Sequence, residues 1–296
     1  MKKISIIIPY FGSWPKWFNI FLKTCKYNTT IDWFFFTNCE KPNNAPKNTH
    51  FVKMTMEDFE KKSSKRTGVN VDIRRGYKIC DFKPAFGDIF ESYIRNYDFW
   101  GWGDIDVVYG NLKSILTSYR LNKYSIISVR RYGTSGVLSV LKNSIYMRKL
   151  YRKSPDYEKV FSSEKGFAFD ETGKFKNRRV FSFTDVVKNQ NINYHFWDHT
   201  ITDKNKEKEN LDLYWKDGRL YDMKYGVEVG LYHFVDRKKD DKFKIHRKID
   251  VSSGFSIKGD GIHEEKSPRT IQRKPLRIVG KKVKDTLRWV KDRVRE

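Results

Sequence analysis

The chain has 296 residues, 39% of them hydrophobic and 16% aromatic, which is enough to bury a sizeable core and argues against disorder throughout. Lys and Arg number 60 against 36 Asp and Glu, and the net charge of +24 indicates an anionic partner such as a diphosphate, a nucleic acid or an acidic lipid. The three cysteines show no zinc-binding spacing and are odd in number, which argues against a disulfide framework and favours a reducing cytoplasm.

Strands and helices are predicted to alternate over the first part of the chain. Residues 4–8 are a continuous, mostly β-branched run, typical of a central strand covered on both faces, and Pro9 ends it. This run is too short for a signal peptide, and no segment reaches the ~20 apolar residues needed to span a bilayer. The next predicted elements are a helix over residues 14–27, strands over 31–36 and 50–54, and a helix from Glu57. This alternation is typical of βαβ units and a parallel sheet.

The middle of the chain continues the pattern after a polar segment. Residues 61–75 are basic and poor in core residues, and we expect a surface loop there that could order over a ligand. The further predicted elements are a helix after Pro84 to residue 97, strands over 98–103, 125–129 and 136–140, and helices over 144–151 and 184–190. The sequence therefore predicts an α/β fold with a mainly parallel central sheet flanked by helices, in one domain over residues 1–253.

The composition changes near residue 254, and we predict a linker over residues 254–268 and a basic helical tail over 269–296. Residues 266–296 hold 12 basic and 3 acidic residues. Apolar side chains recur there at steps of three and four, which places them on one face of a helix: Leu276, Val279, Val283, Leu287, Val290 and Val294. A basic amphipathic helix with Trp289 at its flank suits binding in the plane of an anionic membrane. Packing on the main domain and a coiled-coil contact are the alternatives.

Two aspartates one residue apart follow the predicted strand 98–103. Asp104 and Asp106 form the only Asp-x-Asp of the sequence, between the aromatic run Phe-Trp-Gly-Trp-Gly and a Val-Val-Tyr-Gly segment. Carboxylates at a strand end supply oxygen ligands to a hard divalent cation where the sheet opens into a ligand crevice. We therefore predict a Mn²⁺ or Mg²⁺ site at Asp104 and Asp106, with a polar turn after a core strand as the alternative.

Residues 78–87 (Lys-Ile-Cys-Asp-Phe-Lys-Pro-Ala-Phe-Gly), residues 102–106 (Trp-Gly-Asp-Ile-Asp) and Tyr109-Gly110 together carry a resemblance to a known family. They are similar to a family of bacterial GT-A glycosyltransferases from surface-polysaccharide clusters and, more distantly, to GT-A enzymes of the glycogenin and galactosyltransferase kind. The resemblance spans residues 3–237. It implies a GT-A fold with a Rossmann-like sheet and a nucleotide-sugar donor, a UDP-sugar being favoured. It also implies a glycan or lipid-linked acceptor, and we expect a cytoplasmic protein held peripherally at the inner face of the cell membrane.

The resemblance also implies which residues would meet the donor. In GT-A enzymes the loop after the first strand borders the nucleotide, and the end of the second strand lies beside the base. The donor contacts implied here are Pro9, Tyr10, Phe11, Asn38, Asp81, Lys83, Asp104 and Ile105. Lys83 also stands before Pro84 at a predicted helix start, where a cation is poorly placed for the helix dipole and favours a nearby anion. Core packing of the aromatic residues and a solvated Lys83 are the alternatives.

Residues 230–234, Gly-Leu-Tyr-His-Phe, resemble the late His-Phe segment through which such enzymes often supply a third metal ligand. The resemblance implies that His233 joins Asp104 and Asp106 on the cation, because a neutral imidazole can complete such a ligand set. The alternative is a histidine satisfied within the core. The cations that could neutralise a departing diphosphate are Arg237, Lys238 and Lys239. Less specific ligand candidates are His195 and His199.

A pair of carboxylates, Asp170 and Glu171, stands in a turn-like context after Phe169. An inverting transferase needs one carboxylate to take the proton of the attacking acceptor hydroxyl, and either residue could serve. A retaining enzyme would not need it in that role, and an exposed acidic turn is the alternative. Residues 133–137 are expected to shape the sugar pocket. The rings expected to stack on the acceptor are Tyr194, Trp197 and Trp215.

Two other functions compete with sugar transfer. A nucleic-acid-binding protein would use the +24 charge and the many aromatic residues, but no RNA- or DNA-binding module is recognisable and the basic residues do not interleave with aromatics. We therefore expect no nucleic-acid partner. Neither a Gly-x-Gly-x-x-Gly nor a Walker A segment supports a dehydrogenase or an NTPase, and hydrolysis of a sugar nucleotide is the nearer enzymatic alternative.

Overall fold

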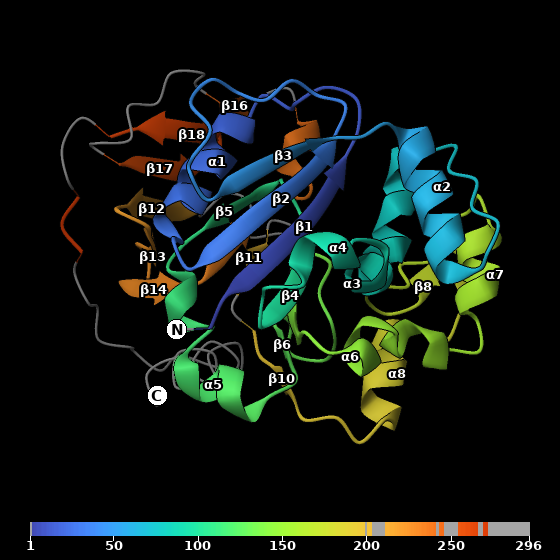
Figure 1. Ribbon diagram of the computed structural model, residues 1–296. Helices are drawn as coiled ribbons and strands as arrows, with labels where there is room; N and C mark the ends of the chain where they lie inside the picture. The colour runs from blue at the N-terminus through green and yellow to red at the C-terminus, as the bar shows by residue number, and fades with distance from the viewer. Residues whose placement is uncertain are drawn as a thin grey trace.

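The computed structural model describes residues 2–198, 200–202, 211–240, 243–245, 254–265 and 269–271 of the chain. These residues form a mixed α/β fold in which helices flank a large, mainly parallel sheet (Figure 1). The predicted fold class is therefore confirmed. The apolar pattern of the predicted tail helix, from Leu276 to Val294, lies outside the described residues.

The central sheet has seven strands, which in spatial order are β10 (Tyr194–Phe196), β6 (Ile126–Ser128), β7 (Leu138–Lys142), β4 (Phe99–Gly103), β1 (Ile4–Tyr10), β2 (Ile31–Thr37) and β3 (Thr49–Lys53). Parallel pairs join β1 to β2 and β4, β2 to β3, and β6 to β10, whereas β7 runs antiparallel to both of its neighbours. The carboxyl ends of β1 and β4 therefore meet at one edge, which is where open α/β sheets bind ligands.

Helices cover the two faces of this sheet through two hydrophobic clusters. α1 (Phe18–Tyr27) packs with Trp33 and Phe35 of β2 on one face. On the other face Trp100 and Trp102 of β4 pack with three helices, namely α2 (Met56–Thr67), α3 (Phe86–Ile89) and α8 (Phe183–Asn189). The other described helices are α4 (Glu91–Ile94), α5 (Ser118–Lys123), α6 (Ile145–Arg148) and α7 (Tyr157–Ser162), with the 3₁₀ helices η1 (Gly76–Ala85), η2 (Leu112–Ser114), η3 (Leu150–Lys153) and η5 (Arg237–Lys239).

Smaller sheets stand beside the central one. β15 (Leu231–His233) pairs with both β5 (Val107–Tyr109) and β11 (Thr200–Thr202). β8 (Lys174–Phe175) and β9 (Arg178–Arg179) form a hairpin. A six-stranded sheet at the left of Figure 1 has the order β14 (Val227–Val229), β13 (Arg219–Asp222), β12 (Asp212–Lys216), β17 (Phe255–Lys258), β18 (Gly261–Glu264) and β16 (Lys244–Ile245).

The linker predicted over residues 254–268 is wrong where the structure describes it. β17 lies between β12 and β18, and its Phe255 and Ile257 are fully buried, as is Ile262 of β18. Two short apolar strands around a Gly-containing turn are a hairpin pattern, and burial of their side chains offsets the entropy lost on ordering them. The sheet therefore continues past the domain boundary predicted at residue 253.

The surface loop predicted over residues 61–75 is also wrong. α2 runs on into this segment and ends at Gly68, whose left-handed backbone (φ 76°) caps the helix. Beyond it Val69, Val71 and Ile73 are buried in the core. These three apolar residues alternate with polar ones, so the apolar side chains face the core and the polar ones face away from it. The segment therefore packs against the domain although it is basic.

A continuous helix after Pro84 is not formed either. The chain passes from η1 into α3 and α4, which are separated at Phe90 (φ −108°, ψ 22°). Gly87 of α3 lies so close to Trp100 that an added Cβ would stand 2.4 Å from the ring. This packing on β4 fixes the segment that carries Lys83 beside the edge of the sheet.

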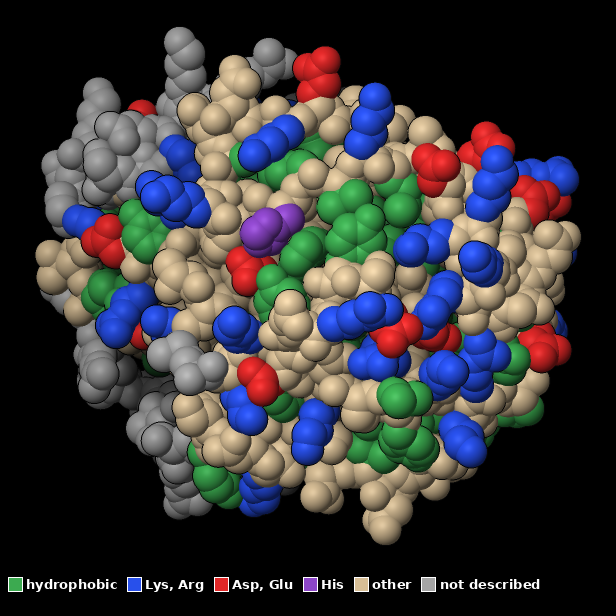
Figure 2. Space-filling view, in the orientation of Figure 1, with side chains coloured by type: hydrophobic (Ala, Val, Ile, Leu, Met, Phe, Trp, Pro, Cys, Tyr) green, Lys and Arg blue, Asp and Glu red, His purple; other side chains and the backbone are tan. Residues whose placement is uncertain are grey.

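Charged side chains are widely distributed on the surface. On the described part of the face shown in Figure 2, Lys and Arg side chains are widely spread, with Asp and Glu side chains between them. Among the described residues, no helix combines the length and the apolar character needed to cross a membrane.

Candidate active site

Asp104, Asp106 and His233 are brought together by two strands that lie far apart in the sequence. The chain leaves the central sheet at the end of β4, passes through Asp104 and Asp106, and enters β5. β5 pairs with β15 in a register that sets Val107 opposite His233. The Phe234 amide also donates to the Asp106 carbonyl at 3.2 Å. The imidazole therefore lies beside the two carboxylates.

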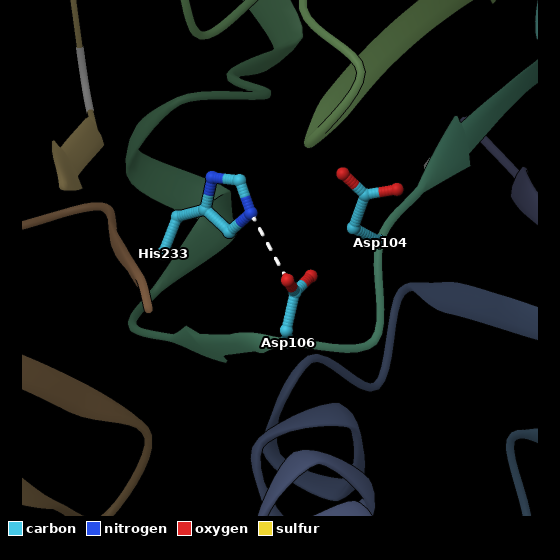
Figure 3. A group of neighbouring side chains, drawn as sticks. All are labelled: Asp104, Asp106 and His233. Atoms are coloured by element: carbon cyan, nitrogen blue, oxygen red, sulfur yellow. Dashed lines mark ion pairs between the residues drawn. The ribbon is translucent and has the colours of Figure 1, made fainter. Parts of the chain in front are cut away.

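These three side chains form a set that fits a divalent cation. One potential ligand atom from each lies within 4.8 Å of the others, and Figure 3 shows the imidazole and both carboxylates facing one another. The His233 Nε2 atom is 3.4 Å from Asp106 Oδ2. Two carboxylates and one imidazole are the oxygen and nitrogen donors that suit Mn²⁺, or Mg²⁺ with more water in its shell. These residues would hold such an ion.

Each carboxylate also contacts a lysine. Lys83 Nζ donates to Asp104 Oδ1 at 2.6 Å, and Lys238 Nζ binds Asp106 Oδ2. Burial alone would raise the pKa of Asp106, but its contacts with His233 and Lys238 lower that pKa well below its usual range. Burial alone would lower the pKa of Lys238, and the neighbouring Asp106 carboxylate raises it instead. The Asp106 carboxylate is therefore held in the charged form that binds a cation.

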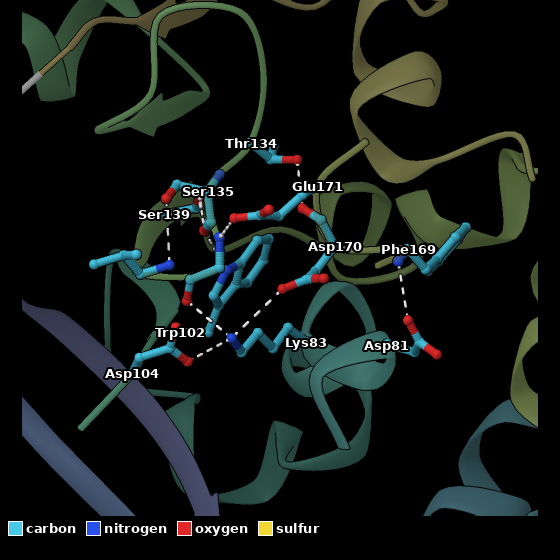
Figure 4. Close-up of polar contacts among 12 residues, drawn as sticks. Asp81, Lys83, Trp102, Asp104, Thr134, Ser135, Ser139, Phe169, Asp170 and Glu171 are labelled. Carbon is cyan, nitrogen blue, oxygen red and sulfur yellow. Dashed lines mark hydrogen bonds and ion pairs between the residues drawn. The ribbon is translucent and has the colours of Figure 1, made fainter. Parts of the chain in front are cut away.

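Lys83 is the centre of a buried network (Figure 4). Besides Asp104, its ammonium donates to the Gly136 carbonyl at 2.9 Å and lies 3.4 Å from Asp170 Oδ2. Burial by itself would lower the pKa of Lys83, but Asp104 and Asp170 raise it well above its usual value. Burial raises the pKa of Asp170 well above its usual value, and Lys83 opposes that shift. One ammonium thus joins the end of β4 to the turn that carries Asp170.

Glu171 lies on the same turn and is fixed by two donors. The Gly136 amide donates to Glu171 Oε1 at 2.9 Å, and Arg130 donates to Oε2 at 2.9 Å. A Cβ added at Gly136 would stand 2.8 Å from Asp170 Oδ2 and 3.1 Å from Lys83 Nζ. Only a glycine lets the backbone approach both groups so closely, as expected for the segment 133–137.

A cavity of about 470 Å³ connects these groups, a volume within the range of small-molecule sites. Its lining includes the predicted ligands Asp104, Asp106 and His233 and the candidate catalytic carboxylates Asp170 and Glu171. The predicted donor contacts that also line it are Pro9, Tyr10, Phe11, Lys83 and Ile105. Tyr10 stacks on Trp14, which lies outside the lining, with 5.2 Å between ring centroids, so the Tyr10 ring is fixed where it faces the cavity.

Asp81 lies outside this cavity, and the geometry of η1 is the reason. Residues three apart in a 3₁₀ helix lie on the same side. Cys80 and Lys83 line the cavity, whereas Asp81 shares a side with Lys78, whose ammonium donates to it at 2.9 Å. Asp81 also accepts hydrogen bonds from the amides of Phe167 and Phe169 at 3.0 and 2.9 Å. It holds the segment before Asp170 rather than facing the cavity.

Asn38 also lies outside the cavity lining. Its Oδ1 atom accepts a hydrogen bond from the Gly12 amide at 2.9 Å and thereby holds the loop after β1. His195 packs between Tyr124 and Trp197, with ring centroids 5.0 and 5.6 Å away, and is not part of the site. His199 falls outside the described residues.

The expected acceptor-stacking role of Trp215 is wrong. Trp215 is fully buried, and its indole donates to the Tyr109 carbonyl at 2.9 Å. Tyr194 and Trp197 do not line the cavity. The lining instead contains residues that were not predicted, among them Trp17, Tyr77 and Cys80. Tyr77 stands one residue before the segment 78–87 and carries no distinguishing pattern of its own.

The fold and the site define an α/β protein with a ligand cavity at the carboxyl edge of a mainly parallel sheet and a candidate cation site in its wall. Residues 6–266 match the sequence profile of a family of unknown function, DUF6625, and the chain belongs to that family. No curated protein matches the chain.

Solved structures similar to this chain are distant. The galactosyltransferase LgtC in complex with donor and acceptor sugar analogues has 11% sequence identity and a TM-score of 0.42, over 78% of this chain and 87% of that one. An active-site mutant of LgtC has 10% identity with the same TM-score and coverage. Mouse xyloside xylosyltransferase 1 in its apo form has 11% identity and a TM-score of 0.43, over 79% of this chain and 99% of that one.

Proposed function

We propose that the protein is a metal-dependent glycosyltransferase that moves a sugar from a nucleotide-sugar donor to a glycan or lipid-linked acceptor in bacterial surface polysaccharide synthesis. A UDP-sugar is the favoured donor. The observation that carries the proposal is the convergence of Asp104, Asp106 and His233 within 4.8 Å in the wall of a cavity. Two ammonium groups, of Lys83 and Lys238, contact the same carboxylates.

The charges of the site suit a diphosphate. A Mn²⁺ or Mg²⁺ ion bound there would stabilise the negative charge that develops on a leaving nucleoside diphosphate. Lys238 is 31% exposed, so its ammonium can turn from Asp106 toward a phosphate oxygen, whereas Lys83 is 6% exposed and stays within its network. Tyr10 and Phe11 line the cavity, and Trp14 supports the Tyr10 ring from outside it, which supports a role for the loop after β1 beside the nucleotide.

Two carboxylates in the cavity are available for the acceptor hydroxyl. In an inverting reaction one of them takes the hydroxyl proton as the oxygen attacks the sugar. Burial raises the pKa of Asp170, so its carboxylate, once ionised, is a stronger base than an ordinary aspartate. Glu171 is held by Arg130 and Gly136, and we assign it to positioning the acceptor if Asp170 takes the proton.

A nucleotide sugar should raise the melting temperature of the protein only when the metal is present. We expect a rise in melting temperature of about 5 °C with a UDP-sugar at about 100 times its Kd in Mn²⁺, since binding stabilises the folded state by mass action. We expect no rise in EDTA. The measurement is a thermal unfolding series with UDP-, GDP- and CMP-sugars, and free sugar serves as the control. The proposal fails if none of these donors gives a metal-dependent shift. Nucleotide release that does not rise with any acceptor would instead indicate a hydrolase.

We also propose that the basic segment beyond residue 271 holds the protein at the inner, cytoplasmic face of the membrane. The amphipathic pattern of that segment supports this location. Removal of residues 272–296 keeps Arg269, whose guanidinium binds both carboxylate oxygens of Asp212 at 2.6 and 2.9 Å. The shortened chain should no longer sediment with phosphatidylglycerol vesicles and should keep its transfer to a soluble acceptor. Phosphatidylcholine vesicles are the control, and unchanged sedimentation with the anionic vesicles would refute this location.

A further inference from the structure

An aromatic pair, exposed Tyr77 and half-buried Phe175, stands at the mouth of the cavity. Tyr77 of η1 lines the cavity and is nevertheless 58% exposed. Its ring stacks on Phe175 of β8, with 5.5 Å between centroids and 30° between planes. The backbone of Gly166 lies against both rings, since a Cβ there would stand 3.6 Å from Tyr77 Cδ1 and 4.0 Å from Phe175 Cδ1. The pair is therefore supported from behind and open toward solvent.

The pair lies on the side of the cavity that holds the candidate base. Tyr77, Cys80 and Lys83 are spaced by three residues in η1 and line the cavity from the same side of that helix. Lys83 Nζ lies 3.4 Å from Asp170 Oδ2, which places Tyr77 on the side of Asp170. An acceptor that reaches Asp170 and Glu171 without crossing the metal ligands would pass Tyr77. Flat, rigid aromatic rings with one exposed face suit the apolar face of a sugar ring.

The hairpin that carries Phe175 is strongly basic. Residues 174–179 read Lys-Phe-Lys-Asn-Arg-Arg and include no acidic residue. None of these four cations has an ion-pair partner within the part of the chain that the structure describes. Arg178 stacks over Phe175 at 5.4 Å and donates to the Gly166 carbonyl at 3.0 Å, so its guanidinium is fixed beside the aromatic pair. Uncompensated cations on so short a segment favour an anionic ligand.

We propose that this surface, the acceptor wall formed by Tyr77, Phe175 and the cations of residues 174–179, binds an acceptor sugar that adjoins an anionic group. The sugar stacks on Tyr77 and Phe175, and the hairpin cations bind the anion. The anion is the carboxylate of an acidic glycan or the diphosphate of a lipid-linked sugar. The inference rests on the proposed function, because it assigns the acceptor to one side of the same cavity.

Two matched pairs of probes test the acceptor wall by calorimetry with the full chain. One pair is an oligogalacturonate tetramer and uncharged maltotetraose, and the other is citronellyl-diphosphate-linked N-acetylglucosamine and the free sugar. We expect the anionic member of at least one pair to bind at least about tenfold more tightly than its neutral partner. The pair that shows the preference identifies the source of the anion, and equal binding of both members in both pairs overturns the proposal.

Variants separate stacking from charge. Tyr77→Ala and Phe175→Ala should each weaken the preferred anionic probe by about tenfold, and Tyr77→Trp should keep its binding because it keeps an aromatic face. Lys174→Gln with Arg179→Gln should remove most of the preference for the anion and its salt dependence. Tyr119→Ala, at a site that is 65% exposed and outside the cavity lining, is the control and should change nothing. Unchanged binding in folded Tyr77→Ala and Phe175→Ala proteins refutes the wall.

The manganese-dependent donor shift of the unaltered chain keeps the two proposals apart. A donor shift without any preference for an anionic probe refutes the acceptor wall and leaves the transferase proposal standing. The opposite result is a preference for an anionic probe that Tyr77→Ala weakens, with no manganese-dependent rise in melting temperature from any donor. It would support the wall as a glycan-binding surface and refute the proposed transfer.

Discussion

Replacing Asp104 and Asp106 together by Asn should lower the rate of sugar transfer by about 10³-fold or more, because the site loses both charges that hold the cation. Asn keeps the size and shape of each side chain. The manganese-dependent rise in melting temperature should disappear at the same time, since donor binding depends on the same ion. The measurements are transfer rates at saturating donor and acceptor in Mn²⁺, together with thermal unfolding.

The control is an aspartate with similar contacts away from the cavity. Asp32 pairs with His50 at 3.0 Å and accepts a hydrogen bond from Tyr97 at 2.9 Å. Asp32→Asn should lose this pair and keep both transfer and the metal response. A folded double variant of Asp104 and Asp106 that still transfers sugar in a manganese-dependent way would contradict the assignment of these residues as ligands.

The single variants Asp104→Asn and Asp106→Asn separate metal binding from the contacts that each carboxylate makes with a lysine. Asp104→Asn frees Lys83, which still has Asp170 at 3.4 Å, whereas Asp106→Asn leaves both His233 and Lys238 without their carboxylate. We expect Asp106→Asn to be the less stable of the two, because Asp106 is 8% exposed and Asp104 is 26% exposed. The requirement for manganese separates the two explanations. If the carboxylates served only to pair with the lysines and held no cation, neither single variant would change the manganese requirement of transfer.

The central strands could be predicted because their patterns are local. The runs at residues 4–8, 31–36 and 98–103 are apolar on both faces, which a strand buried between two layers of helices requires. The Asp-x-Asp position followed from the end of the third run. His233 could be proposed only by resemblance, because its place beside Asp106 depends on β5 pairing with β15, a contact between segments remote in the sequence.

The errors have equally specific causes. Asp81 and Lys83 stand two residues apart in the same motif, and only the three-residue turn of η1 sends Lys83 into the cavity and Asp81 to the amides of Phe167 and Phe169. A sequence does not distinguish a 3₁₀ helix from the start of an α-helix. The sequence predicts a linker where β17 and β18 form, because strands of four residues among basic and polar neighbours give a weak periodic pattern.

Lys83→Gln should abolish transfer and also destabilise the protein by about 3 kcal/mol, because it leaves a buried carboxylate without its cation. The buried group is Asp170, whose pKa is raised by burial. Among the charges that act on it most strongly, Lys83 is the one that opposes this upward shift. The free energy of unfolding from denaturant titration measures the loss of stability, and the transfer rate measures the loss of activity. A folded Lys83→Gln protein with unchanged rate and stability would show that the network is dispensable.

The double variant Lys83→Gln with Asp170→Asn separates structure from chemistry. It removes both buried charges, so most of the lost stability should return, since a neutral pair of similar shape avoids the cost of an unpaired charge. Transfer should not return, because the Lys83 ammonium also holds Asp104 at 2.6 Å and the Gly136 carbonyl at 2.9 Å, and Asp170 is a candidate base. Recovery of stability and transfer together would mean that Lys83 serves only to neutralise Asp170. Recovery of stability alone would show that transfer needs Lys83 and Asp170 for more than mutual neutralisation, because the pair links Asp104 at the end of β4 to the turn that carries Glu171.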